Sequence, residues 1–240
     1  MTLRLHVAPD AASLARDAAR FVASAVLERD AERYALCLSG GKTPRATYEL
    51  LAREKLPWQR MHFFFTDERH VPPDDPRANV LMAREALFDA VGVAAENIHA
   101  VPTRGRSPEA AAAAYDEDCA RFFGRDDPAA PGALFDVVLL GLGEDGHTAS
   151  LFPGNPVLEV RSRWAAAVAD PSVPEPRVTL TLPALAASRH TAFLAEGAGK
   201  RDILARLVAG EESLPAARVA PSRAGLDAFV DAAAAGERTR

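Results

Sequence analysis

The fold is decided by one stretch of the chain, which runs FDVVLLGLGEDGHTASLFPG from Phe135 to Gly154. Its first part, Phe135 to Leu140, is a short apolar run rich in branched residues, as expected of a buried strand. A glycine-rich loop follows at once, and glycine allows sharp backbone turns that other residues resist. The stretch therefore predicts a buried strand that presents polar side chains at its carboxyl end.

Similar apolar runs predict further strands at Leu3 to Val7, Tyr34 to Leu38, Met61 to Thr66, Trp164 to Ala169, Val178 to Leu182 and His190 to Ala195. Helical patterns lie between several of them, at Ser13 to Glu28, Pro44 to Glu54, Val80 to Val91, Pro108 to Phe123 and Lys200 to Ala209. Such alternation is typical of an α/β fold with a mostly parallel sheet and helices on its faces. We expect the helices to begin at capping side chains in Thr43-Pro44, Asn79 and Ser107-Pro108-Glu109.

Length and composition suit one globular domain over residues 1–240. Apolar residues make up 48% and charged residues 25% of the chain, close to the average for globular proteins. The best linker candidate is the proline-rich segment Pro171 to Pro176, but a strand-like pattern resumes directly after it. We therefore expect a single domain.

The charge pattern argues against nucleic-acid partners, because the net charge is −5 and the arginines are scattered. Met1 to Asp10 lacks the features of a signal peptide, and no apolar run approaches membrane-spanning length. We expect a cytoplasmic protein without a membrane partner, in which Cys37 and Cys119 are buried, reduced thiols.

Ligands of an open parallel sheet bind beyond the carboxyl ends of its strands, where three unusual loops should converge. The first loop reads Ser39-Gly40-Gly41-Lys42-Thr43-Pro44. A glycine pair that leads into a helix directs backbone N–H groups and the positive helix dipole towards one point, which favours a phosphate site. A tight turn with a solvated lysine is the alternative.

The second loop reads Thr66-Asp67-Glu68-Arg69 and follows a run of three phenylalanines. Its position favours a ligand site in which the planar guanidinium of Arg69 binds phosphate, and a surface salt-bridge cluster is the alternative. Lys200 ends a further glycine-rich turn, Glu196-Gly-Ala-Gly-Lys200, and is a third candidate phosphate ligand. A surface lysine is the alternative there.

The third loop contains Asp145 and His147, and an aspartate two residues from a histidine can orient the ring or support its charged form. Most single histidines are structural, but the glycine-flanked position at a strand end favours catalysis. Backbone N–H groups around Gly143 to Gly146 are candidate donors to an oxyanion.

We expect no metal and no cofactor, because the other histidines, His62, His70, His99 and His190, lack ligand spacing. A serine triad is disfavoured as well, since Ser150 lies outside a nucleophile elbow and Ser39 lies in the phosphate-like loop.

Together the three motifs closely resemble the 6-phosphogluconolactonase family in order and spacing. The resemblance continues through Asn79 with Met82-Ala-Arg-Glu85, through Arg177 to Pro183 and through Gly197 to Asp202, so it covers nearly the whole chain. It implies a Rossmann-like fold shared with sugar-phosphate deaminases. The implied activity is hydrolysis of 6-phospho-D-glucono-1,5-lactone to 6-phosphogluconate in the oxidative pentose phosphate pathway.

The resemblance also implies roles for particular residues. His147 would be the base that activates water, with Asp145 beside it, and Arg69, Lys200 and the loop from Ser39 to Thr43 would surround the phosphate. Further active-site candidates are Asp67, Asn79, Gly143, Gly146 and Thr148.

The sequence departs from the family pattern at Asp75, Ala78 and Ala186, where members often have His, Ser and Asn.

One alternative function is a glucosamine-6-phosphate isomerase and deaminase, although Phe152 stands where that family has a glutamate. Another is a non-catalytic sugar-phosphate sensor, for which we find no DNA-binding helix-turn-helix segment or basic flank. We expect a monomer or a weak homodimer that binds a small sugar-phosphate lactone.

Overall fold

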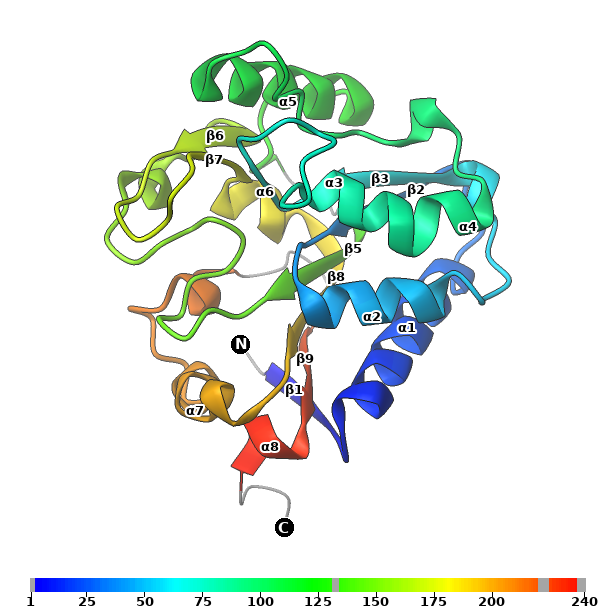
Figure 1. Ribbon diagram of the computed structural model, residues 1–240, viewed down its shortest axis with the longest axis vertical. Coiled ribbons are helices and arrows are strands. Elements are labelled where there is room, and N and C mark those ends of the chain that lie inside the picture. The colour runs from blue at the N-terminus through cyan, green and yellow to red at the C-terminus, as the bar shows by residue number, and fades with distance from the viewer. Residues whose placement is uncertain (1–2, 131–133, 220–224, 237–240) are drawn as a thin grey trace.

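The computed structural model describes residues 3–130, 134–219 and 225–236. Six parallel strands form the main sheet in the order β1-β9-β8-β5-β2-β3 (Figure 1). Their bounds are β1 Leu3–Ala8, β2 Tyr34–Leu38, β3 Met61–Phe65, β5 Phe135–Gly141, β8 Ser188–Ala195 and β9 Leu226–Asp231. The predicted α/β fold with a mostly parallel sheet is confirmed.

Helices cover both faces of this sheet, as predicted. Alternate side chains of β2 point to opposite faces, so Leu36 and Leu38 join one buried core while Ala35 and Cys37 join the other. The first core includes helices α1 (Ala11–Leu27) and α2 (Lys42–Leu51), and the second includes α5 (Pro108–Phe123) and α7 (Arg201–Val208). A strand buried on both faces is apolar throughout, which explains its sequence.

A second, smaller sheet lies beside the first and is antiparallel, in the order β4-β7-β6. Its strands are β4 Asp67–Arg69, β6 Ala165–Val168 and β7 Arg177–Leu180, and α5 lies over β6 and β7 in Figure 1. Thr66 joins the two sheets, because its N–H donates to Leu38 of β2 and its carbonyl accepts from Leu180 of β7. We predicted a loop where β4 forms, and this prediction was wrong.

Helix starts agree with the sequence in one case of three. Ser107 caps α5 by accepting from Ala110 N at 3.2 Å, as predicted. Helix α2 begins at Lys42 with Gly41 as its cap at φ 114°, so Thr43 lies within the helix rather than before it. Asn79 is the first residue of α3 (Asn79–Ala83), and its side chain does not cap that helix.

The remaining elements are short. Helix α3 continues through a π-helical turn at Arg84–Phe88 into α4 (Asp89–Val91), in place of the one helix predicted from Val80. Helix α6 (Leu182–Ala186) follows β7, and α8 (Ala232–Ala235) follows β9. Short 3₁₀ turns occupy Trp58–Arg60, Ala95–Asn97, Pro156–Glu159, Ala198–Lys200 and Pro215–Arg218.

Two further predictions can be compared with the structure. Cys37 and Cys119 are both buried, free thiols, as expected. Among the described residues, the helices are too short or too polar to cross a membrane.

Candidate active site

A cavity of about 600 Å³ opens beyond the carboxyl ends of the main strands. Side chains from the loops after β2, β5 and β8 line it together with β4 and β7 of the small sheet. It contains nine of the predicted site residues: Ser39, Gly40, Asp67, Arg69, Asn79, Gly143, Asp145, His147 and Lys200. The three loops therefore converge where the sheet topology placed them.

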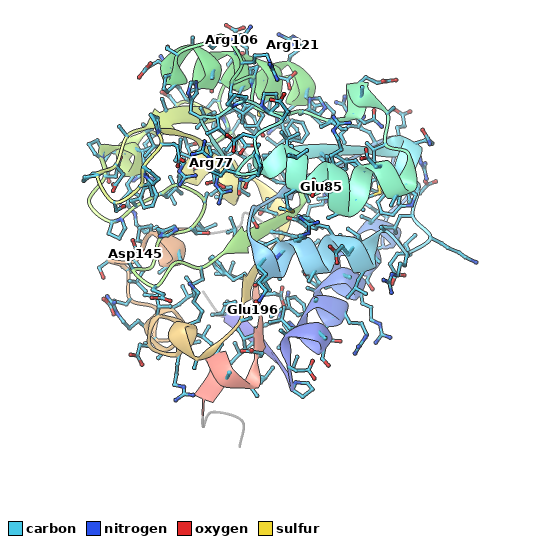
Figure 2. All side chains as sticks on the ribbon, in the orientation of Figure 1. Arg77, Glu85, Arg106, Arg121, Asp145 and Glu196 are labelled. Atoms are coloured by element: carbon cyan, nitrogen blue, oxygen red, sulfur yellow. The ribbon has the colours of Figure 1, made fainter. Side chains whose placement is uncertain are left out.

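His147 and Asp145 form a hydrogen-bonded pair in the wall of this cavity. The Nδ1 atom of His147 lies 2.6 Å from Asp145 Oδ1, and the His147 backbone N–H donates to the same oxygen at 3.1 Å. A carboxylate only accepts, so Nδ1 carries the hydrogen and Nε2 is left as the basic nitrogen. In the view of Figure 2, Asp145 lies at the left edge of the molecule and Arg77 lies higher, beside the small sheet.

The charge of Asp145 supports this arrangement. Burial acts to raise the pKa of Asp145, but the backbone N–H and the ring of His147 outweigh it and hold the pKa below its ordinary value. The carboxylate therefore stays ionised at neutral pH and can stabilise a protonated ring. The ring also packs against Phe152, with centroids 4.9 Å apart.

Two glycines shape the loop that carries this pair. A Cβ atom at Gly143 would overlap the His147 ring and lie 2.7 Å from Asp145 Oδ1, so only glycine fits there. The N–H of Gly143 donates to His147 O at 2.8 Å, and the N–H of Gly146 donates to Gly143 O at 3.1 Å. Both donors are used within the loop, which corrects the expectation that these two N–H groups serve an oxyanion.

Five predicted residues lie outside the lining that the described residues form: Gly41, Lys42, Thr43, Gly146 and Thr148. Lys42 is exposed, whereas Thr43 is buried in the first turn of α2. Gly146 packs against Leu214, and the hydroxyl of Thr148 donates to Gly141 O at 2.8 Å. The Thr148 side chain thus ties the loop back to the last residue of β5.

Ser39 presents a buried hydroxyl to the cavity. The residue is 4% exposed, and its Oγ has no hydrogen-bond partner among the described residues. Its backbone is fixed by Tyr48, whose hydroxyl accepts from Ser39 N and donates to Ser39 O, both at 2.9 Å. A buried polar atom without a partner is costly, so this hydroxyl is available to a ligand.

Strands β4 and β7 bring two arginines to the same cavity. Arg69 and Arg177 are direct cross-strand partners, and both line the cavity. The Nε atom of Arg177 is buried without a partner among the described residues. Burial lowers the pKa of Arg177, and the positive charge of Arg69 lowers it further. Like charges opposite one another are unfavourable in a sheet, so this pair is suited to an anion between them.

Asp67 and Asn79 complete this wall. The hydroxyl of Ser150 donates to Asp67 Oδ2 at 2.6 Å, and Asn79 Nδ2 donates to Asp67 O at 2.8 Å. A side chain at Gly40 would overlap the Asn79 amide, which explains the glycine at that position. The carboxylate of Asp67 is thereby held at the cavity surface, where it can accept hydrogen bonds from sugar hydroxyls.

Glu68 is neither a ligand of the cavity nor part of a surface salt bridge. It is 2% exposed, and its carboxylate accepts from the backbone N–H groups of Arg69, Asn79 and Val80 at 2.7–2.9 Å. It therefore caps α3 from a neighbouring strand. Burial raises the pKa of Glu68 to about 7, although the three N–H donors act to lower it.

The chain is similar to known proteins in both sequence and structure. The pattern of the family described as glucosamine-6-phosphate isomerases/6-phosphogluconolactonase matches residues 9–228. The chain belongs to this family. A 6-phosphogluconolactonase of Nostoc sp. is 46% identical over 179 residues, covering 74% of this chain and 72% of that one. One from Streptomyces coelicolor is 35% identical over 252 residues, covering 100% and 96%.

A crystal structure of 6-phosphogluconolactonase from Thermotoga maritima superposes with a TM-score of 0.81. It is 29% identical in sequence, and the match covers 96% of this chain and 100% of that one. The resemblance predicted from the three motifs is therefore confirmed, and so is the Rossmann-like fold class.

The three departures from the family pattern can now be placed. Asp75 accepts two hydrogen bonds from the guanidinium of Arg77, and Ala78 is buried directly before α3. Ala186 is the last residue of α6, and Figure 1 shows α6 beside the small sheet. Asp75 is the departure nearest in contacts to the cavity, because its partner Arg77 accepts a hydrogen bond from the lining residue Arg69.

Sequence reasoning missed several lining residues, including Glu144, Ser150, Ser172, Val173 and Arg177. Arg177 stood within a recognised motif, but nothing in its spacing showed that it would face Arg69. Ser150 was considered only as a nucleophile. Among the described residues, no group of three or more His, Cys, Asp or Glu side chains could hold a metal ion.

Proposed function

We propose that this protein is a 6-phosphogluconolactonase, which hydrolyses 6-phospho-D-glucono-1,5-lactone to 6-phospho-D-gluconate in the oxidative pentose phosphate pathway. The observation that carries the proposal is one cavity that contains both the Asp145–His147 pair and the Arg69–Arg177 pair. The first pair suits activation of water, and the second suits binding of a phosphate group.

In the proposed reaction, His147 acts as the general base. Nε2 removes one proton from a water molecule while the water oxygen bonds to the lactone carbonyl carbon. The bond between that carbon and the ring oxygen then breaks, and His147 returns the proton to the ring oxygen, which becomes a hydroxyl. Asp145 keeps the ring oriented and stabilises its protonated form, as its low pKa allows.

The phosphate of the substrate is bound away from the reacting carbonyl. Arg69, Arg177 and Lys200 supply positive charge, and Ser39 supplies its unpaired hydroxyl. From the loop after β2 we retain Ser39 and Gly40 as phosphate contacts, because Lys42 and Thr43 lie outside the cavity lining. Binding a remote phosphate holds the flexible lactone in a reactive position and so raises its rate of hydrolysis.

The alternative activity, deamination of glucosamine 6-phosphate, requires protons to be moved during ring opening. Phe152 packs on the catalytic histidine at the position where a carboxylate would be needed, and a phenyl ring cannot transfer a proton. A lactone requires no ring-opening relay of this kind, because its carbonyl is already open to attack.

The deciding experiment follows acid release from freshly prepared phosphogluconolactone, corrected for spontaneous hydrolysis. We expect rapid release by the wild-type protein and almost none above background by the His147→Ala variant. The same preparation is incubated with glucosamine 6-phosphate, and ammonia is measured. Ammonia release at a rate that rivals lactone hydrolysis would support the deaminase instead, and binding without either reaction would support a sensor.

We further propose that the enzyme acts in the cytoplasm as a monomer or weak homodimer, without a nucleic-acid or membrane partner. The net charge of −5 supports the absence of a nucleic-acid partner. Sedimentation of the purified protein across a range of concentrations tests the oligomeric state.

A further inference from the structure

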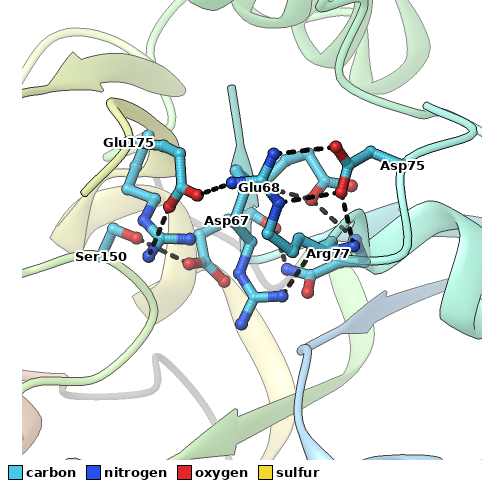
Figure 3. A network of polar contacts seen from close by, with 9 residues as sticks. Asp67, Glu68, Asp75, Arg77, Ser150 and Glu175 are labelled. Carbon is cyan, nitrogen blue, oxygen red and sulfur yellow. Dashed lines mark hydrogen bonds and ion pairs between the residues drawn. The ribbon is translucent and has the colours of Figure 1, made fainter. Parts of the chain in front are cut away.

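Arg77 lies outside the cavity and ties together two segments that border it. Its Nε and NH2 atoms donate to the two carboxylate oxygens of Asp75 at 2.9 and 2.8 Å. Its NH1 atom donates to Glu175, in the segment before β7. Figure 3 shows Arg77 between Asp75 and Glu175. One guanidinium thus links the segment after β4 to the segment before β7.

Each end of this link reaches one arginine of the cavity. Arg69 NH1 donates to the backbone carbonyl of Arg77 at 2.6 Å. On the other side, Glu175 Oε2 lies 3.9 Å from Arg177 NH2, and both of these side chains are largely buried. The backbone carbonyl of Arg77 therefore holds Arg69, and the side chain of Arg77 reaches Arg177 through Glu175. The bonds of that side chain to Asp75 and Glu175 also fix the backbone segment that carries the carbonyl, so removing the side chain loosens both contacts.

The two cavity arginines need such support, because they are cross-strand neighbours of like charge. Their repulsion, and the gain from hydration, favour rotation of the guanidinium groups away from one another. The contacts with the Arg77 carbonyl and with Glu175 oppose this rotation. Because the two guanidinium groups are already held in place before a ligand arrives, less conformational entropy is lost when the ligand binds.

The contacts of Arg77 should affect anion binding more than they affect the stability of the fold. The side chain of Arg77 is 57% exposed. Asp75 and Glu175 are 19% and 15% exposed, but solvent around the Arg77 guanidinium screens both ion pairs, so the link should add only about 1 kcal/mol to folding stability. The affinity of two arginines for an anion depends strongly on their geometry, since forked hydrogen bonds require the correct orientation of each guanidinium group.

We propose that Arg77 is a positioning residue, which holds Arg69 and Arg177 in the geometry that binds the anionic group of the substrate. This inference rests on the proposed function only in taking that group to be the phosphate of a lactone. Asp75 and Glu175 are its partners in the same role. Asp75 fixes the Arg77 guanidinium, and Glu175 contacts both Arg77 and Arg177.

The test compares Arg77→Ala with Arg104→Ala. Arg104 is a matched control, because it is 65% exposed and pairs with Asp74 in the same segment at 2.7 Å. We expect Arg77→Ala to raise KM for the phosphorylated lactone roughly tenfold and to change kcat less than about twofold. KM for plain gluconolactone should not change. The Arg104→Ala variant should behave as wild type.

Two further measurements keep the inference open to refutation. Arg77→Lys keeps the charge but cannot make the forked bond to Asp75 while reaching Glu175, so it should show an intermediate KM. Orthophosphate should raise the melting temperature of wild type more than that of Arg77→Ala. This second readout needs no turnover, so it still tests Arg77 if the wild type fails to hydrolyse the lactone.

Wild-type KM in the Arg77→Ala variant, or an equal loss on both lactones, would overturn the inference. An equal effect of orthophosphate on the melting temperatures of both proteins would overturn it as well.

Discussion

The loop after β5 and the small antiparallel sheet build the two sides of the cavity in different ways. In the loop, His147 is held by Asp145, a near neighbour in sequence, at 2.6 Å. In the small sheet, Arg69 and Arg177 meet only through the antiparallel register of β4 and β7. A local motif can be recognised in the sequence, whereas a pair formed by register appears only once the chain has folded. In the proposed mechanism the difference also divides the chemistry, since the loop would supply the general base and the small sheet would supply positive charge for the phosphate.

The largest effect is expected on the loop side of this comparison. His147→Ala should lower kcat by roughly two to four orders of magnitude, because a general base contributes about that much. KM should change little, since the arginines remain. Steady-state kinetics of a variant whose circular dichroism matches wild type provides the check. Near-normal turnover in that folded variant would show that His147 is not the base.

The same contrast explains how much of the molecule could be predicted. The strand and loop from Phe135 to Gly154 were predicted closely, because a doubly buried parallel strand is apolar throughout and the loop glycines are local signals. Strand β9 was missed, because Asp227 and Asp231 interrupt its apolar pattern. Asp227 is nevertheless 1% exposed, since Arg4 and His6 of β1 contact its carboxylate at 2.7–3.0 Å.

The cap of α3 was mispredicted for a related reason. The cap of α3 is Glu68, which comes from β4 in the neighbouring sheet. Rules for helix caps consider only the residues next to the helix, so they cannot find a cap supplied from another element.

The second prediction concerns Glu68, which joins the small sheet to α3. Burial raises the pKa of Glu68 to about 7 in the folded protein, from an ordinary value of 4.5. The folded state therefore holds this proton more firmly than the unfolded state. Its contribution to stability is complete below pH 4.5 and is lost as the pH rises through about 7.

Glu68→Gln removes this titration, so comparing it with wild type isolates the contribution of Glu68 to the pH dependence of stability. The free energy of unfolding of wild type, relative to Glu68→Gln, should fall by up to about 3 kcal/mol between pH 5 and pH 8. Urea unfolding at several pH values measures it. A difference that rises with pH would show that the three N–H donors outweigh burial and that the pKa is not raised.

The third prediction returns to the loop. Gly143→Ala places a methyl group against the His147 ring and 2.7 Å from Asp145 Oδ1, so the pair must move. A shift of about 1 Å in a catalytic group can reduce the rate roughly 100-fold. Gly141→Ala is the comparison, because no atom of the described residues, apart from the two chain neighbours, lies within 4 Å of the added Cβ. If both variants lose the same activity, the close approach at Gly143 is not the cause.

The smallest effect is expected in the small sheet, where replacing one arginine leaves its partner in place. Arg177→Ala should raise KM for the phosphorylated lactone by roughly tenfold, since loss of one of several contacts to the phosphate costs about 1.4 kcal/mol. Arg69 would then be relieved of its like-charged neighbour, which offsets part of the loss. The Arg69→Ala, Arg177→Ala double variant should therefore lose more than the two single variants together, because only then is the second guanidinium missing.

Plain gluconolactone separates this role from a structural one, because it has no phosphate for the arginines to bind. Its KM should be the same in wild type and in Arg177→Ala. Arg189→Ala serves as a matched control, since Arg189 is a partly buried arginine at the beginning of β8, at the opposite end of the sheet from the cavity. If Arg177→Ala impairs both lactones equally, or Arg189→Ala raises KM as much, the small sheet does not hold the phosphate. Phosphate binding would then depend on Ser39, Gly40 and Lys200.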